Sequence, residues 1–164
     1  MEKAQVTLPS DQEVKVTRAF KASRALVYRT YSEPALVRRW MLGPPGWTMP
    51  VCEMDLRVGG AYRWRWRSDD GDKEFGFHGV FREIEAGKKF VHTQTFDPGN
   101  LGQESQGGEA IVTLTFAEAN GVTTVTTVID FGSKEVRDAT LATGMTDGME
   151  LSYQGLERLF AELS

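Results

Sequence analysis

Hydrophobic and polar residues alternate along much of this chain, which is the pattern of half-buried β-strands. Between Glu13 and Phe20, the residues Val14 and Val16 share the parity of Phe20, whereas Lys15 and Thr17 take the other. Similar strand signals recur in six later segments, separated by residues that favour turns. We therefore expect further strands at 47–55, 61–67, 74–84, 89–96, 110–117 and 122–131.

Helical signals flank the main run of strands. Ser23 can cap a short helix, and Pro34 can begin a second one before the Gly-Pro-Pro-Gly segment at 43–46 imposes a loop. Ser133 can cap a later helix, and Gly144 separates it from a longer terminal helix with apolar residues three and four positions apart. This order predicts an α+β domain whose sheet curves around the terminal helix.

Length and composition narrow the class of protein. The 164 residues, 40% of them hydrophobic, suit one domain, which we place at 12–164 behind a flexible tail at 1–11. A formal net charge of −4 argues against general nucleic-acid binding, and no apolar run is long enough to span a membrane. Cys52 is the single cysteine, and the first residues lack the features of a signal peptide. We therefore expect a cytoplasmic protein.

Three motifs carry a family resemblance. They are W-x-x-G-P-P-G-W from Trp40 followed by D-L-R-V-G-G-A-Y-R, G-V-F-R-E-I from Gly79, and G-M-x-x-S-Y-x-x-L-x-x-L from Gly148. Together they resemble the START-like (SRPBCC) superfamily, and within it the single-domain bacterial type of the heat-shock-protein-90 ATPase-activator-homologue family. The resemblance implies a helix-grip fold, in which a curved seven-stranded antiparallel sheet surrounds a long C-terminal helix and two short helices follow strand one. It also implies a cavity between sheet and helix.

That cavity supplies the hypothesis for a site, since apolar side chains of both layers can enclose a space. In the strand at 61–67, aromatic residues alternate with arginines, so Trp64 and Trp66 share one face and can stack on a flat ligand. Met149 and Tyr153 stand where family members often carry Trp and Leu, so we expect a different pocket shape. The residues expected to contact a ligand are Trp64, Trp66, Phe77, His92, Gln94, Met145, Met149, Tyr153, Leu156 and Phe160. The helix residues among them fit core packing equally.

Few residues of the sequence suggest a catalytic, reactive or metal-binding role. His92 shares the parity of Phe90 and Phe96, so it can face the interior, where a neutral imidazole can orient a ligand hydroxyl or act as a general base. Tyr153 can hydrogen-bond with His92 or Gln94 across the cavity. A purely structural role for each is the alternative. We read Cys52 as structural, and the two histidines have no carboxylate spacing typical of a metal site.

The leading interpretation is a noncatalytic protein that binds a small hydrophobic or aromatic ligand. The alternative is an enzyme on the same scaffold, a cyclase, hydratase or hydrolase of an apolar substrate, with His92 and Tyr153 as its catalytic residues. The third, regulation of a chaperone ATPase, comes from the family name alone, and one domain leaves no room for the additional domain of the eukaryotic activators. We expect no chaperone partner, nucleic acid, membrane, metal or cofactor, and a monomer or homodimer.

Overall fold

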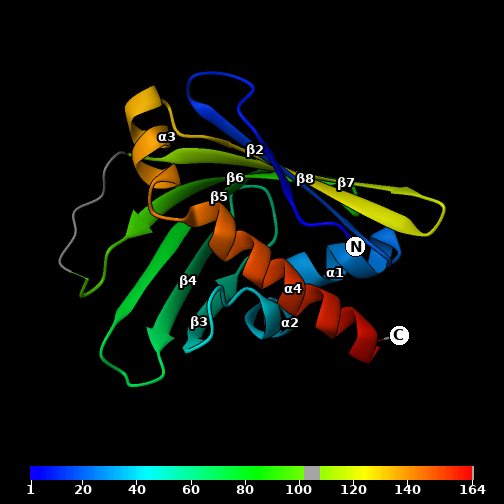
Figure 1. Ribbon diagram of the computed structural model, residues 1–164, viewed down its shortest axis with the longest axis horizontal. Helices are drawn as coiled ribbons and strands as arrows, with labels where there is room; N and C mark the ends of the chain where they lie inside the picture. Colours follow the sequence, from blue (N-terminus) through cyan, green and yellow to red (C-terminus); the bar gives the residue numbers. More distant parts are fainter. Residues whose placement is uncertain (102–107, 164) are drawn as a thin grey trace.

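The computed structural model describes residues 1–101 and 108–163. It is an α+β fold in which one curved, unclosed antiparallel sheet has the strand order β1-β2-β8-β7-β6-β5-β4-β3 (Figure 1). The strands are β1 (Gln5–Thr7), β2 (Glu13–Phe20), β3 (Trp47–Met54), β4 (Ala61–Ser68), β5 (Glu74–Glu85), β6 (Lys89–Asp97), β7 (Ala110–Ala119) and β8 (Val122–Asp130). The helices are α1 (Arg24–Ser32), α2 (Pro34–Trp40), α3 (Lys134–Leu141) and α4 (Met145–Leu163). Within the described ranges, no helix has the length and hydropathy to cross a membrane.

The expected helix-grip architecture is confirmed, with one strand more than predicted. The sheet has eight strands instead of seven, because Gln5–Thr7 pairs with β2 inside the segment that we predicted to be a flexible tail. All three residues of β1 are exposed on this sheet edge. A strand without a buried face shows no alternation, so the sequence pattern could not reveal it.

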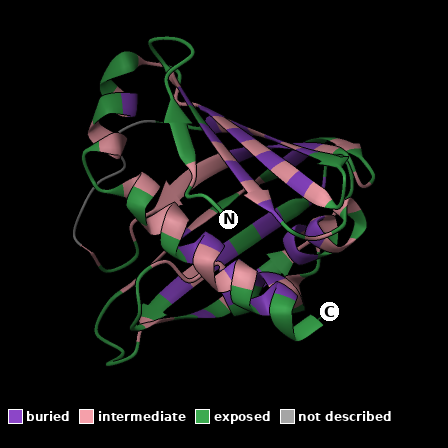
Figure 2. Ribbon diagram, turned by 45° about the vertical axis from the view of Figure 1, so that its right-hand side comes forward, coloured by how far each residue is buried: buried purple, intermediate pink, exposed green. Residues whose placement is uncertain are grey.

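Side chains alternate between the two faces of the sheet, and the face toward α4 forms the core. Val14 and Val16 on β2 pair with Ile129 and Thr127 on β8, and all four side chains are buried. The turn between β7 and β8 is formed by Asn120 and Gly121, both with positive φ, as a tight hairpin requires. Figure 2 shows the resulting alternation of buried and less buried positions along the strands. We call the side toward α4 the inner face.

The terminal helix crosses this inner side and is buried mainly along its second half (Figure 1). Phe20 of β2 meets the rings of Tyr153 and Phe160 edge-on, at centroid distances of 5.9 and 5.6 Å. At Gly155, α4 lies against α2, where an added Cβ would be in ordinary contact with the carbonyl oxygen of Trp40 at 3.4 Å. The buried residues of α4 are Ser152, Tyr153, Leu156, Leu159 and Phe160. From Met145 to Leu151 no side chain is fully buried.

Candidate ligand-binding site

A continuous set of aromatic rings covers the inner face of β3 to β6. The outermost rings are only half-buried, and the inner ones have less than a tenth of their surface exposed. Neighbouring ring centroids in this set lie 4.4 to 6.4 Å apart, the range of favourable aromatic pairs. We call it the aromatic face: half-buried Trp47, Phe75, Phe77 and Phe96, and buried Tyr62, Trp64, Trp66 and Phe81.

Strand parity explains how these rings come together. On β4 the residues Tyr62, Trp64 and Trp66 point inward, whereas the arginines between them lie on the outer face, as the sequence predicted. Trp64 pairs with Phe77, and Phe77 pairs in turn with Phe96. The predicted contact residues Trp64, Trp66 and Phe77 are therefore neighbours in the structure.

The indole nitrogens of the buried tryptophans differ in their hydrogen bonding. Nε1 of Trp40 donates to the carbonyl oxygen of Thr30 at 2.8 Å, and Nε1 of Trp66 donates to that of Met41 at 2.6 Å. Nε1 of Trp64 is buried but has no hydrogen-bond partner among the described residues. Buried polar groups of proteins are nearly always paired, so this nitrogen is an exception that asks for an explanation.

His92 lies deep in the same face, on β6, with 2% of its surface exposed. Its Nδ1 lies 3.0 Å from the hydroxyl oxygen of Tyr62 and 2.9 Å from the carbonyl oxygen of Thr93. Burial lowers the pKa of His92 to about 4, although the hydrogen bond to Thr93 works in the opposite direction. The imidazole is therefore neutral at physiological pH. His78, the other histidine, is exposed on the outer face.

Tyr153 does not meet His92 or Gln94, so the hydrogen bond that we expected between them is not formed. Tyr153 packs on Phe20 of β2, and a hydrogen bond with the Thr127 side chain of β8 partly offsets the burial that raises its pKa to about 12. His92 belongs to β6, and β7 lies between β6 and β8. The two groups proposed as a catalytic pair are thus held over different parts of the sheet.

The remaining predicted contact residues differ in where they lie and in how deeply they are buried. Leu156 and Phe160 are buried in the core, and the ring of Phe160 meets that of Phe20 on β2. Gln94 is half-buried on β6 with the parity of His92. Met145 and Met149, at the start of α4, are half-buried and pack against the core.

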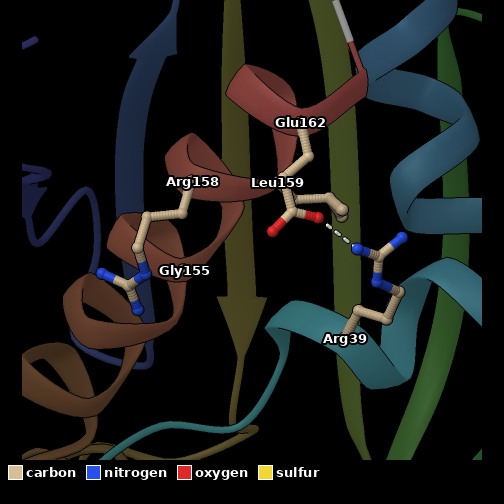
Figure 3. Close-up of a pocket in the computed structure, with 5 residues that line it drawn as sticks. All are labelled: Arg39, Gly155, Arg158, Leu159 and Glu162. Atoms are coloured by element: carbon tan, nitrogen blue, oxygen red, sulfur yellow. Dashed lines mark hydrogen bonds and ion pairs between the residues drawn. The ribbon is translucent and has the colours of Figure 1, made fainter.

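Two open hollows of the described chain lie along α4. One, of about 150 Å³, is lined by Arg39 of α2 and by Gly155, Arg158, Leu159 and Glu162 of α4 (Figure 3). There Arg39 forms an ion pair with Glu162, while Arg158 extends away from both. The other, of about 240 Å³, is lined by Met1 and Lys21 and by Glu157, Phe160 and Ala161 of α4, so it includes one predicted contact residue. Neither hollow is lined by a residue of β3 to β6, so neither opens onto the aromatic face.

Comparison with known proteins identifies the family. The model of the activator of Hsp90 ATPase homolog 1-like protein family matches residues 21–161. The chain belongs to this family. The resemblance drawn from the motifs is thereby confirmed. No curated protein matches the chain.

Solved structures of bacterial proteins share the fold of this activator-homologue chain. A protein of Rhodobacter sphaeroides is 26% identical, with a TM-score of 0.88 over 98% of this chain and 99% of its own. Protein Ms6760 of Mycobacterium smegmatis is 21% identical, with a TM-score of 0.83 and 96% of each chain covered. The AHSA1-like protein of Aeromonas hydrophila is also 21% identical, with a TM-score of 0.68 over 88% of this chain and 93% of its own.

Sequence reasoning missed one internal charge of this family member. Arg18 points to the inner face with 2% of its surface exposed, although it stands on β2 between Val16 and Phe20. Its Nε and Nη2 atoms donate to the two carboxylate oxygens of Glu150 at 3.1 and 3.0 Å, and Nη2 also reaches Glu157 at 2.5 Å. The signal was present, since Arg18 has the parity of its buried neighbours. This ion cluster ties α4 to the sheet.

Neither a reactive thiol nor a metal centre is found in the part of the chain that the structure describes. Burial raises the pKa of the Cys52 thiol to about 11, against the opposing effect of Arg38, so the thiol stays protonated and unreactive. The described residues also hold no group of three or more His, Cys, Asp or Glu side chains arranged for a metal ion. The aromatic face with His92 is thus the main candidate site.

Proposed function

We propose that this protein binds a small apolar or aromatic molecule against its aromatic face. The observation that carries the proposal is the passage, on one inner face, from half-buried rings to fully buried ones. Trp66 stacks on Phe75 with an interplanar angle of 24°, and Phe75 is itself half-buried and touches the ring of Trp47. Flat, partly exposed rings of this kind favour stacking with a flat ligand.

Access to the aromatic face requires movement, because neither hollow found in the described chain opens onto it. The residues of the first turn of α4, from Met145 to Met149, are the natural part to move, since their side chains are at most half-buried, whereas Glu150 binds Arg18 and the second half is anchored in the core. They begin after Gly144, which has a positive φ of 84°, and contain Gly148, a residue that lowers helix stability. We propose that Met145 and Met149 line the opening, where their flexible side chains can adapt to a ligand.

A noncatalytic role is favoured over the enzyme alternative. The enzyme alternative named His92 and Tyr153 as its catalytic residues. They lie over different strands of the sheet, and the neutral, low-pKa imidazole of His92 is a weak base. Cytoplasmic location, a monomeric or homodimeric state and the domain boundary at residue 12 stay predictions.

The proposal is tested by titrating the purified protein with N-phenyl-1-naphthylamine, an apolar dye whose fluorescence rises on burial, and by native mass spectrometry for a retained ligand. We expect saturable binding that Met149→Glu weakens at least about tenfold, since it places a charge at the opening. The control is Leu151→Glu on the same helix, where the side chain is already 38% exposed. It should bind like the unmodified protein.

Absence of both saturable dye binding and any retained ligand would contradict the proposal. Equal loss of dye binding in Met149→Glu and Leu151→Glu would contradict the assigned opening. Circular dichroism of each variant establishes whether the fold is kept.

A further inference from the structure

We infer that the ligand carries a hydroxyl group on its apolar or aromatic body, and that this hydroxyl accepts a hydrogen bond from Nε1 of Trp64 and donates one to Nε2 of His92. The inference rests on the proposed function and names the chemical class of its ligand. It follows from one unpartnered donor and one acceptor on the same inner face.

The donor is the indole N–H of Trp64. The residue is 8% exposed, and its Nε1 has no hydrogen-bond partner in the described structure. The indole N–H of Trp66, its neighbour on the same face of β4, donates to the backbone carbonyl oxygen of Met41. An indole in this part of the sheet can therefore find a partner within the protein. An indole nitrogen can only donate, so whatever satisfies Trp64 must present an acceptor.

The acceptor is fixed by the hydrogen bonds around His92. The carbonyl oxygen of Thr93 can only accept, and it receives the hydroxyl proton of Tyr62 at 2.6 Å. Nδ1 of His92 lies 2.9 Å from this oxygen and 3.0 Å from the Tyr62 hydroxyl, whose proton is already used. Nδ1 therefore carries the hydrogen of the neutral ring, and Nε2 presents a lone pair. The hydrogen bonds found for His92 among the described residues both involve Nδ1.

The two rings are direct neighbours on the inner face. The centroids of Trp64 and His92 lie 5.9 Å apart at an interplanar angle of 77°. A hydroxyl is both donor and acceptor, whereas an ether or ketone can satisfy Trp64 alone. A carboxylate is disfavoured for two reasons. It would face the lone pair of Nε2, and Arg18, the buried cation of the inner face, is already bound to Glu150 and Glu157. The site therefore selects an alcohol or a phenol.

The test compares three probes of the same ring system: 1-naphthol, 1-methoxynaphthalene and 1-methylnaphthalene. Calorimetric titration should give about tenfold tighter binding of 1-naphthol than of 1-methylnaphthalene, with the ether between them. Trp64→Phe removes the donor but keeps an aromatic ring, so it should abolish most of this preference. The matched control, Trp66→Phe, removes an N–H that is already satisfied by Met41. It should change the affinities of all three probes together and preserve their ratio.

The outcomes separate this inference from the proposed function. Equal affinity for the three probes in the unmodified protein overturns the hydroxyl inference and leaves the binding function standing. Failure of all three probes and of N-phenyl-1-naphthylamine overturns both. If Trp64→Phe does not fold, the indole signal of Trp64 in a ¹H–¹⁵N spectrum decides: a downfield shift with 1-naphthol alone supports the inference, and the same shift with 1-methylnaphthalene refutes it.

Discussion

Replacing Arg18 by methionine should reveal how strongly the terminal helix depends on one buried charge. The guanidinium is held between β2 and α4 by Glu150 and Glu157, and it lies 5.0 Å from the ring centroid of Phe20. Methionine has a similar length and fills the apolar part of the space. The substitution therefore tests the charge and its hydrogen bonds more than the packing.

The expected loss is about 3 kcal/mol in the free energy of unfolding at pH 7. Breaking a buried ion pair by removing one partner costs about 3–5 kcal/mol, because the other charge stays buried without compensation. Glu150 keeps only 13% of its side-chain surface exposed, but Glu157 keeps 34% and is partly hydrated, which places the loss at the lower end. For a chain of 164 residues, this lowers Tm by about 6–12 °C.

The loss should depend on pH, with a sign that follows from Glu150. Burial alone would raise the pKa of this carboxyl, but the ion pair with Arg18 and the N–H of Ala4 outweigh burial and lower it. In the unmodified protein this carboxylate therefore stabilises the fold above its unfolded pKa near 4.5, and the stabilisation is lost on further acidification. Without Arg18, burial raises the pKa of the Glu150 carboxyl. Its protonation then removes the unpaired buried charge from the variant, so the stabilities of the variant and the unmodified protein converge below about pH 5.

Urea unfolding followed by tryptophan fluorescence measures both effects. Arg29→Met is the control: its ion pair with Glu33 is exposed, so the change should stay within about 0.5 kcal/mol. Arg18→Met combined with Glu150→Met should recover part of the loss, since it removes the unpaired buried charge. A loss below about 1 kcal/mol for Arg18→Met, or one that is the same at pH 7 and pH 4, would refute the reasoning.

Three further predictions use the same unfolding assay. Gly148→Ala should stabilise the protein by about 0.5–1 kcal/mol and slow dye binding, because the added Cβ meets nothing within 4 Å and the first turns of α4 become stiffer. Gly79→Ala should cost more than about 2 kcal/mol, because its Cβ would lie 2.1 Å from the carbonyl oxygen of Thr93. Since burial lowers the pKa of His92 to about 4, the unmodified protein should lose up to about 3 kcal/mol more than His92→Gln between pH 6.5 and 4; parallel pH profiles would contradict this.

Much of the fold could be predicted from the sequence, because hydrophobic and polar residues alternate along a strand that has one buried face. The inward parity of Trp64 and His92 followed directly from the residues beside them, and the four helix starts were marked by Ser23, Pro34, Ser133 and Gly144. The exposed β1 strand could not be found in this way, because neither of its faces is buried.

Contacts between distant elements could not be predicted from parity. Tyr153 and His92 both face inward, yet only the strand order shows that β7 separates the strands to which they belong. The partner of His92 is Tyr62, which reaches it from β4 across β5, and no spacing in the sequence indicates that contact. The volume left between sheet and helix likewise depends on side-chain packing between the layers, which the alternation within either layer alone does not indicate.

The two halves of α4 differ in a way that can reconcile a packed interior with ligand binding. From Glu150 onward the helix is held by the Arg18 cluster, by the rings of Tyr153 and Phe160 and by contact with α2 at Gly155, so the fold does not depend on the first turn. The residues of that first turn, from Met145 to Met149, can then move away at a modest cost in free energy, because none of their side chains is fully buried. On this argument, a ligand that displaces them gains the aromatic face while the anchored half of the helix keeps the sheet folded.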